Sequence, residues 1–202
     1  MPVRKIPKNY LFVTGAYASK KNKSMDGFES LLEKDYYMLL DFDSTVKSFD
    51  VQPVKIPVPG AAKKYVPDVL VKFHPDPVTG EIRRNELAEV KTTADLTRNA
   101  EKYAPKFASA QQYAKDHEWD FRIVTEKEIR GPRLSNLKFL RAYRNVQVTN
   151  DQKNTVLDFV RTADGSSSST KILESLAPSD DDKLKWLPVL WSMVVTSVEV
   201  QG

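Results

Sequence analysis

The chain has 202 residues, of which 41% are hydrophobic, and this is enough to bury the core of one domain with a small appendage. It contains no cysteine and only two histidines, which excludes disulfides, thiolate metal sites and a histidine-rich zinc centre. The formal net charge of +4 is a modest basic excess that fits a nucleic-acid partner without establishing one.

Residues 1–23 combine basic and aromatic side chains. Tyr10–Val13 predicts a short strand, and a solvated loop follows it. A basic segment with aromatic residues can also follow a DNA backbone, so Lys20 and Lys21 are candidate DNA contacts.

Residues 26–42 predict an amphipathic helix, because apolar side chains recur there at helical spacing. Ser24 or Asp26 is suited to cap its start. Glu29 and Glu33 are four residues apart on one flank of the apolar stripe. We expect Glu29 to be a solvated carboxylate and Glu33, at the edge of the buried face, to be aimed at a site formed further along the chain.

The middle of the chain predicts a mixed sheet. Residues 46–56 have strand character, and Pro53 indicates a sheet edge or a bend. β-forming residues also flank Asp68 and Glu89, and residues 74–80 between them suit a hairpin turn. A segment at 99–116, in which Pro105 begins or breaks a helix, leads to a strand at 120–126, and this order is a crossover with helices packed on the sheet.

The predicted hairpin brings one carboxylate from each strand to a single lysine. Side chains alternate along a strand, so Glu89 and Lys91 point the same way and can converge with Asp68. Mg²⁺ takes oxygen ligands, often one or two carboxylates with water and substrate phosphate, and a neighbouring lysine can position or help deprotonate a water. The pattern predicts a site for phosphodiester hydrolysis, while solvated charges on an exposed hairpin are the alternative that the motif alone leaves open.

Beyond residue 145 the sequence changes in character. We expect helices at 151–161, at 170–176 and from 178 through 191, a flexible segment at 165–169, and a terminal strand from Val194 to Val200. These elements suggest a small helix-turn-helix or winged-helix-like domain. Its acidic run, Asp180 to Asp182, would repel DNA, so docking on a protein fits at least as well as reading DNA.

Several motifs resemble, in their order along the chain, the TnsA-type endonuclease subunit of heteromeric transposases: Leu32-Glu33, Leu40-Asp41-Phe42-Asp43, Val46, Gln52-Pro53, Tyr65-Val66-Pro67-Asp68 and Glu89-Val90-Lys91. Pro67-Asp68 followed by Glu89-Val90-Lys91 also resembles the metal site of restriction-endonuclease-like nucleases. The resemblance implies an α/β fold. Residues 1–145 would form a restriction-endonuclease-like mixed sheet flanked by helices, and residues 146–202 a small helical, winged-helix-like domain.

The resemblance also implies an active site of Glu33, Asp68, Glu89 and Lys91. In it, Asp68, Glu89 and Glu33 would be the metal ligands of Mg²⁺, with Mn²⁺ as a substitute. Where some relatives carry glutamine, this chain has Glu89, a full carboxylate. The candidate DNA-binding residues are Lys20, Lys21, Lys63 and Lys64.

The function implied is that of a metal-dependent DNA endonuclease that cleaves the 5′ ends of a transposon in cut-and-paste transposition. Its partners would be transposon-end DNA, a DDE-type transposase that cuts and joins the 3′ ends, and an ATPase regulator. A cytoplasmic, nucleoid-associated bacterial protein is expected, with no membrane span and no secretory leader. Two alternatives are a self-sufficient restriction- or repair-type endonuclease and a non-catalytic DNA-binding or scaffold protein. The intact set of four site residues argues against the second.

Overall fold

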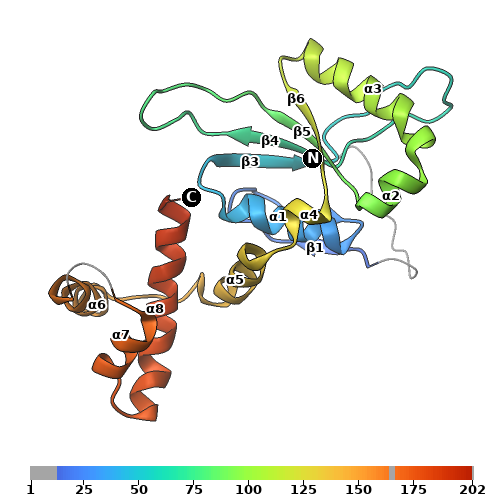
Figure 1. Ribbon diagram of the computed structural model, residues 1–202. Helices are drawn as coiled ribbons and strands as arrows, with labels where there is room; N and C mark the ends of the chain where they lie inside the picture. The colour runs from blue at the N-terminus through green and yellow to red at the C-terminus, as the bar shows by residue number, and fades with distance from the viewer. Residues whose placement is uncertain (1–12, 164–166, 202) are drawn as a thin grey trace. The chain divides into compact units, whose positions relative to one another are not determined.

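The computed structural model describes residues 13–163 and 167–201 (Figure 1). In it the chain divides into two compact units, residues 1–135 and 136–202. The strand expected at Tyr10–Val13 lies outside the described residues except for its last position.

The first unit is built on a four-stranded mixed sheet of order β3-β4-β5-β6. The strands are β3 (Val46–Val51), β4 (Val69–Phe73), β5 (Glu86–Val90) and β6 (Asp120–Val124). β4 pairs antiparallel with both β3 and β5, whereas β5 and β6 are parallel and joined through α2 (Thr93–Arg98) and α3 (Ala100–Asp116). Figure 1 shows the sheet between α1 (Leu31–Phe42) and α3. The mixed sheet flanked by helices is therefore confirmed, and it is consistent with a restriction-endonuclease-like fold.

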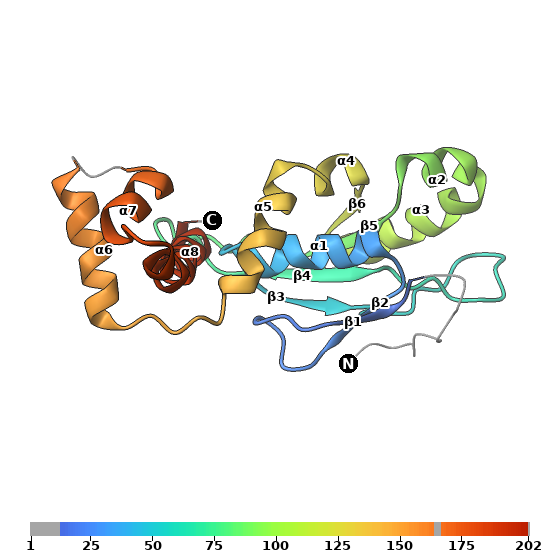
Figure 2. The same cartoon turned by 90° about the horizontal axis from the view of Figure 1, so that it is seen from below.

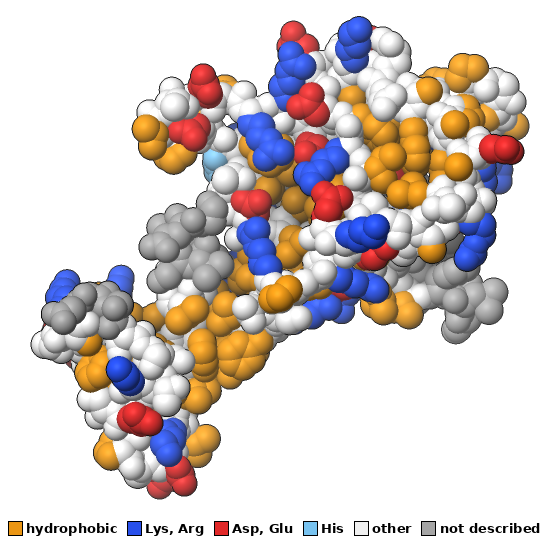
Figure 3. Space-filling view, in the orientation of Figure 1, with side chains coloured by type: hydrophobic (Ala, Val, Ile, Leu, Met, Phe, Trp, Pro, Cys, Tyr) orange, Lys and Arg blue, Asp and Glu red, His pale blue; other side chains and the backbone are white. Residues whose placement is uncertain are grey.

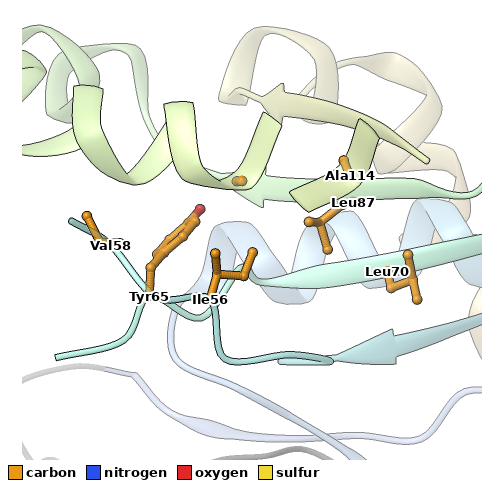
Figure 4. Close-up of a cluster of buried hydrophobic side chains, with 7 residues drawn as sticks. Ile56, Val58, Tyr65, Leu70, Leu87 and Ala114 are labelled. Carbon is orange, nitrogen blue, oxygen red and sulfur yellow. The ribbon is translucent and has the colours of Figure 1, made fainter. Parts of the chain in front are cut away.

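The helix α3 packs closely on the sheet because it presents small residues to it. Ala110 and Ala114 are fully buried and belong to one apolar cluster with Leu70 of β4 and Leu87 of β5. Tyr65, from the segment before β4, completes this cluster beneath α3 (Figure 4). All of β5 is buried, as expected of a central strand covered on both faces.

The helix α1 begins at Leu31, later than predicted, because Asp26–Phe28 forms the strand β2. This strand pairs antiparallel with β1 (Gly15–Tyr17), and β2 also contacts β3 at the edge of the main sheet (Figure 2). The N-cap is Ser30, and not Ser24 or Asp26: its Oγ accepts from the backbone N–H of Glu33 at 3.1 Å. Buried Phe28 fitted the helical spacing although it reaches the core from a strand.

The strand β3 ends where the backbone leaves the extended region. Gln52 has a positive φ of 48° and Pro53 follows it, so the strand stops at Val51. Ile56, which the alternation had placed in the same strand, instead forms an isolated bridge with Tyr65. The chain between them is a loop that returns Tyr65 to the sheet.

Pro105 lies inside α3, so the prediction that it begins or breaks a helix was wrong. Proline lacks the N–H that would bond the carbonyl of Glu101, one turn earlier. Glu101 is exposed, so water can satisfy that carbonyl.

All the secondary-structure elements described in the second unit are helices. After α4 (Glu126–Ile129), α5 (Pro132–Leu140) crosses the boundary between the units, and a 3₁₀ turn (Arg141–Tyr143), α6 (Asn150–Thr162), α7 (Ser169–Leu176) and α8 (Asp180–Gln201) follow. Val156, Ile172 and Leu190, one from each of the last three helices, form a buried cluster. None of the helices described in either unit has the length and apolar character needed to cross a membrane.

The terminal strand predicted for Val194–Val200 is wrong, because these residues continue α8. Val189, Ser192 and Val195 are buried at helical spacing, so packing of the preceding turns carries the helix through the valines. The described part of this unit contains no strand and hence nothing that could form a wing.

Candidate active site

Asp68, Glu89 and Lys91 meet at one end of the β4–β5 pair. Asp68 immediately precedes β4, and the register that pairs Val69 with Ala88 places Asp68 opposite Glu89. The Nζ atom of Lys91 lies 2.7 Å from Oε1 of Glu89 and 3.3 Å from Oδ2 of Asp68. One ammonium group therefore bridges carboxylates from two strands.

The backbone fixes Asp68 from both neighbouring strands. Its Oδ2 accepts the N–H of Val90 at 2.8 Å, and its carbonyl oxygen accepts the N–H of Gln52 at 2.8 Å. Because these donors belong to the ends of β5 and β3, the carboxylate has a set position relative to the sheet.

Tyr65 holds the other oxygen of Glu89. Its hydroxyl donates to Oε2 at 2.6 Å, and the Ile56–Tyr65 bridge anchors its backbone. Glu89 is only 3% exposed, so both oxygens of a buried carboxylate have a partner, Lys91 on one side and Tyr65 on the other. The sequence motif contained Tyr65, but only the fold shows its contact with Glu89.

Glu33 stands at the first turn of α1, and its carboxylate serves the helix start. It accepts from the hydroxyl of Ser30 at 2.9 Å and from the backbone N–H of Glu29 at 2.8 Å. In the described residues, no three His, Cys, Asp or Glu side chains are grouped closely enough to hold a metal ion. Glu33 is thus electrostatically coupled to Asp68 but does not form a ready three-carboxylate cluster with Asp68 and Glu89.

Glu29, expected to be a solvated helix carboxylate, lies before α1 and lines the same pocket as Asp68 and Glu89. Its Oε1 accepts from the amide of Gln52 at 3.2 Å. Two glutamates near the start of α1 therefore lie close to the site. Glu33 interacts electrostatically with Asp68, and Glu29 lines the pocket.

Burial and crowding of negative charge set the protonation of the site. Burial raises the pKa of Glu89, and the charge of Asp68 raises it further, to about 7 despite the nearby Lys91. The same two causes raise the pKa of Glu33 to about 7. Burial alone would lower the pKa of Lys91, but Asp68 and Glu89 outweigh it and raise the pKa above its usual value. Lys91 is therefore a fixed ammonium donor at neutral pH, suited to orienting a water rather than deprotonating it.

The carboxylates open into a pocket of about 720 Å³ with a strongly basic lining. Six lysines line it: Lys55, Lys63, Lys64, Lys91, Lys102 and Lys106. Lys63 and Lys64 were predicted as DNA contacts from the sequence. Lys91 follows β5 and was predicted as part of the active site, whereas Lys55 comes from the β3–β4 loop and Lys102 and Lys106 from α3, whose approach to the site depends on how the crossover packs.

The other two candidate DNA-binding lysines lie elsewhere. Lys20 is exposed, and its backbone N–H bonds to buried Asp41 at 3.0 Å. The ammonium of Lys21 donates to the backbone carbonyls of Asp43 and Val46, just beyond the end of α1. Neither lines the pocket, and the Lys21 contacts are of the kind that closes a helix C-terminus.

The donor set suits a hard divalent cation held by two carboxylates. Burial and the charge of Asp68 raise the pKa of both Glu33 and Glu89, as expected where carboxylates are crowded together. Mg²⁺ is commonly bound through one or two carboxylates, with waters and substrate phosphates completing the shell. Asp68 and Glu89 are the residues that would hold it, and both face the pocket.

Comparison with known families identifies the segment that contains this site. Residues 43–126 match the family model described as TnsA-like endonuclease N terminal. The match begins between α1 and β3 and ends at the first residue of α4; it includes Asp68, Glu89 and Lys91, whereas Glu33 precedes it. No curated protein matches the chain.

Proposed function

Since residues 43–126 form a TnsA-like endonuclease N-terminal domain, we propose that this chain is the DNA endonuclease subunit of a heteromeric transposase, cutting at the 5′ ends of the transposon. The observation that carries the proposal is the convergence of Asp68, Glu89 and Lys91 in a lysine-lined pocket within the matched segment. A DNA strand is a polyanion, so the lysines attract it, and a divalent cation held by the carboxylate pair would receive the scissile phosphate.

The division of labour follows from the contacts of each residue. Asp68 and Glu89 would hold Mg²⁺, or Mn²⁺ in its place, and the bound ion supplies charge stabilisation at the phosphate and an acidified water. Lys91, held protonated, donates its N–H groups to the attacking water or to a phosphate oxygen and so orients the reacting groups. Tyr65 keeps Glu89 in one orientation, and Glu33 supports the shell from the start of α1.

The second unit is proposed to bind protein partners. Residues 136–202 contain eight basic and eight acidic residues, so the entire net charge of +4 belongs to the first unit. A neutral unit with Asp180, Asp181 and Asp182 at the start of its longest helix offers DNA little attraction. The partners proposed are a DDE-type transposase subunit and an ATPase regulator.

The proposal is tested by asking whether DNA cleavage by this chain depends on the transposase partner. The isolated chain should bind DNA weakly and in a strongly salt-sensitive way, with little cleavage. Adding the cognate transposase and end DNA should yield cuts at the 5′ ends, and Asp68→Ala or Glu89→Ala should abolish them. Glu101→Ala, on an exposed carboxylate of α3 outside the pocket, is the matched control and should cut normally.

Two outcomes would replace the proposal. Efficient, sequence-independent digestion of plasmid DNA by the isolated chain would favour a self-sufficient nuclease. Normal 5′ cutting by folded Asp68→Ala protein would remove the site from the chemistry altogether.

A further inference from the structure

Five lysines at the pocket have no carboxylate partner among the described residues: Lys55, Lys63, Lys64, Lys102 and Lys106. Several other cations of the same unit are paired, for example Lys72 with Asp50 at 2.7 Å and Arg122 with Glu128. Figure 3 shows such Lys and Arg side chains next to Asp and Glu side chains over β6 and α4. Unpaired like charges repel when they gather at one place, so this collection favours a polyanionic ligand.

The five lysines come from two separate elements. Lys55, Lys63 and Lys64 belong to the loop between β3 and β4, whereas Lys102 and Lys106 belong to α3. Lys102 and Lys106 are four residues apart, so they lie one above the other on the same face of the helix. The α3 pair therefore gives the pocket a second basic wall, which the sequence did not reveal.

The α3 wall is held in place by its own contacts. Between the two lysines, Tyr103 donates its hydroxyl to Asp95 at 2.6 Å and stacks on Phe107 with ring centroids 5.3 Å apart. The Nζ atom of Lys106 lies 5.7 Å from the centroid of the Tyr103 ring, within cation–π range. Phe107 in turn contacts Tyr65, which binds Glu89. The wall is thus joined to the catalytic carboxylate through packed aromatic rings.

We propose that Lys102 and Lys106 bind backbone phosphates of the DNA strand that is cut, in addition to the phosphates held by the lysines of the β3–β4 loop. The strand then contacts both basic walls of the pocket that contains Asp68 and Glu89. This inference rests on the proposed function and extends its DNA contacts to a helix for which the sequence predicted none.

The test measures DNA binding without cleavage, in metal-free buffer, between about 50 and 200 mM salt. The double variant Lys102→Gln/Lys106→Gln should lower the slope of log affinity against log salt by about two, because each lost phosphate contact lowers it by about one. Lys115→Gln, an exposed lysine of the same helix outside the pocket, is the matched control and should leave the slope unchanged. The double variant Lys102→Arg/Lys106→Arg should keep the wild-type slope, since arginine can make the same phosphate contacts.

Three results would overturn the α3 wall: an unchanged slope in the double variant, an equal loss in Lys115→Gln, or no measurable binding of DNA by the wild-type chain at the lowest salt. The exposed Lys102→Gln single variant keeps the test decisive if the double variant is unstable, and its expected loss is about one. Failure here leaves the endonuclease proposal separately testable, because Asp68→Ala would still abolish 5′ cutting in the assembled system.

Discussion

Tyr65 donates its hydroxyl to Glu89 at 2.6 Å, and this bond joins the loop after β3 to the central strand of the sheet. The ring is buried beneath α3, in one cluster with Ala110 and Ala114. The bond leaves Glu89 with one orientation toward Lys91 and the pocket. Tyr65 is therefore a positioning residue for the carboxylate that we place at the metal.

Tyr65→Phe should keep the fold but lower the Mg²⁺ affinity and the cleavage rate. The ring still fills its place in the core, but Glu89 loses its hydroxyl donor, and loss of such a supporting contact costs about ten- to hundredfold in metal affinity or activity. Single-turnover cleavage of 5′ ends and Mg²⁺ affinity by calorimetry would both report it. Tyr113→Phe, in the last turns of α3, is the control. Wild-type affinity and rate in Tyr65→Phe would show that the bond is only structural.

We expect opposite effects on cleavage when each of the two glutamates near α1 is replaced by glutamine. Glu33→Gln should lose cleavage. Glutamine also serves at this helix position, so the capping interaction with Ser30 is kept and the loss would report the missing negative charge. Glu29→Gln should cut at nearly the wild-type rate. Parallel cleavage assays with melting curves separate the cases, and the reverse pattern would give the third carboxylate role to Glu29, which lines the pocket.

Mg²⁺ should stabilise the wild-type chain without any DNA present. A cation bound only by the folded state raises Tm, and for a unit of this size we expect roughly 2 to 8 °C at saturating Mg²⁺. The rise should be larger at pH 8 than at pH 6, because Glu89, whose pKa is raised to about 7, must lose its proton to bind the cation, and Glu33, whose pKa is also raised to about 7, adds negative charge nearby when it ionises. Scanning calorimetry of the wild type and of Asp68→Ala tests this, and an equal rise in both proteins would place the ion elsewhere.

The sequence predicted the convergence of Asp68, Glu89 and Lys91 because it depends on local rules, namely strand alternation and a single hairpin. It could not predict where α1 begins, since Phe28 satisfies helical spacing and strand pairing equally well. The valines after residue 193 were assigned by β propensity, and packing of the preceding helical turns overrode it. Lys102 and Lys106 were missed as site residues because their place at the pocket depends on how α3 crosses the sheet.

The most direct test of the account is the product formed when Lys91→Ala replaces the wild-type chain in the assembled transposase. Lys91 bridges both site carboxylates, so its removal should stop 5′ cutting while the partner continues to cut and join the 3′ ends. Sequencing and sizing of the products should then show joined, cointegrate-forming intermediates with the donor flank still attached, in place of cut-and-paste insertions. Simple insertions with normally cut 5′ ends in the folded Lys91→Ala protein would contradict the assignment of this site.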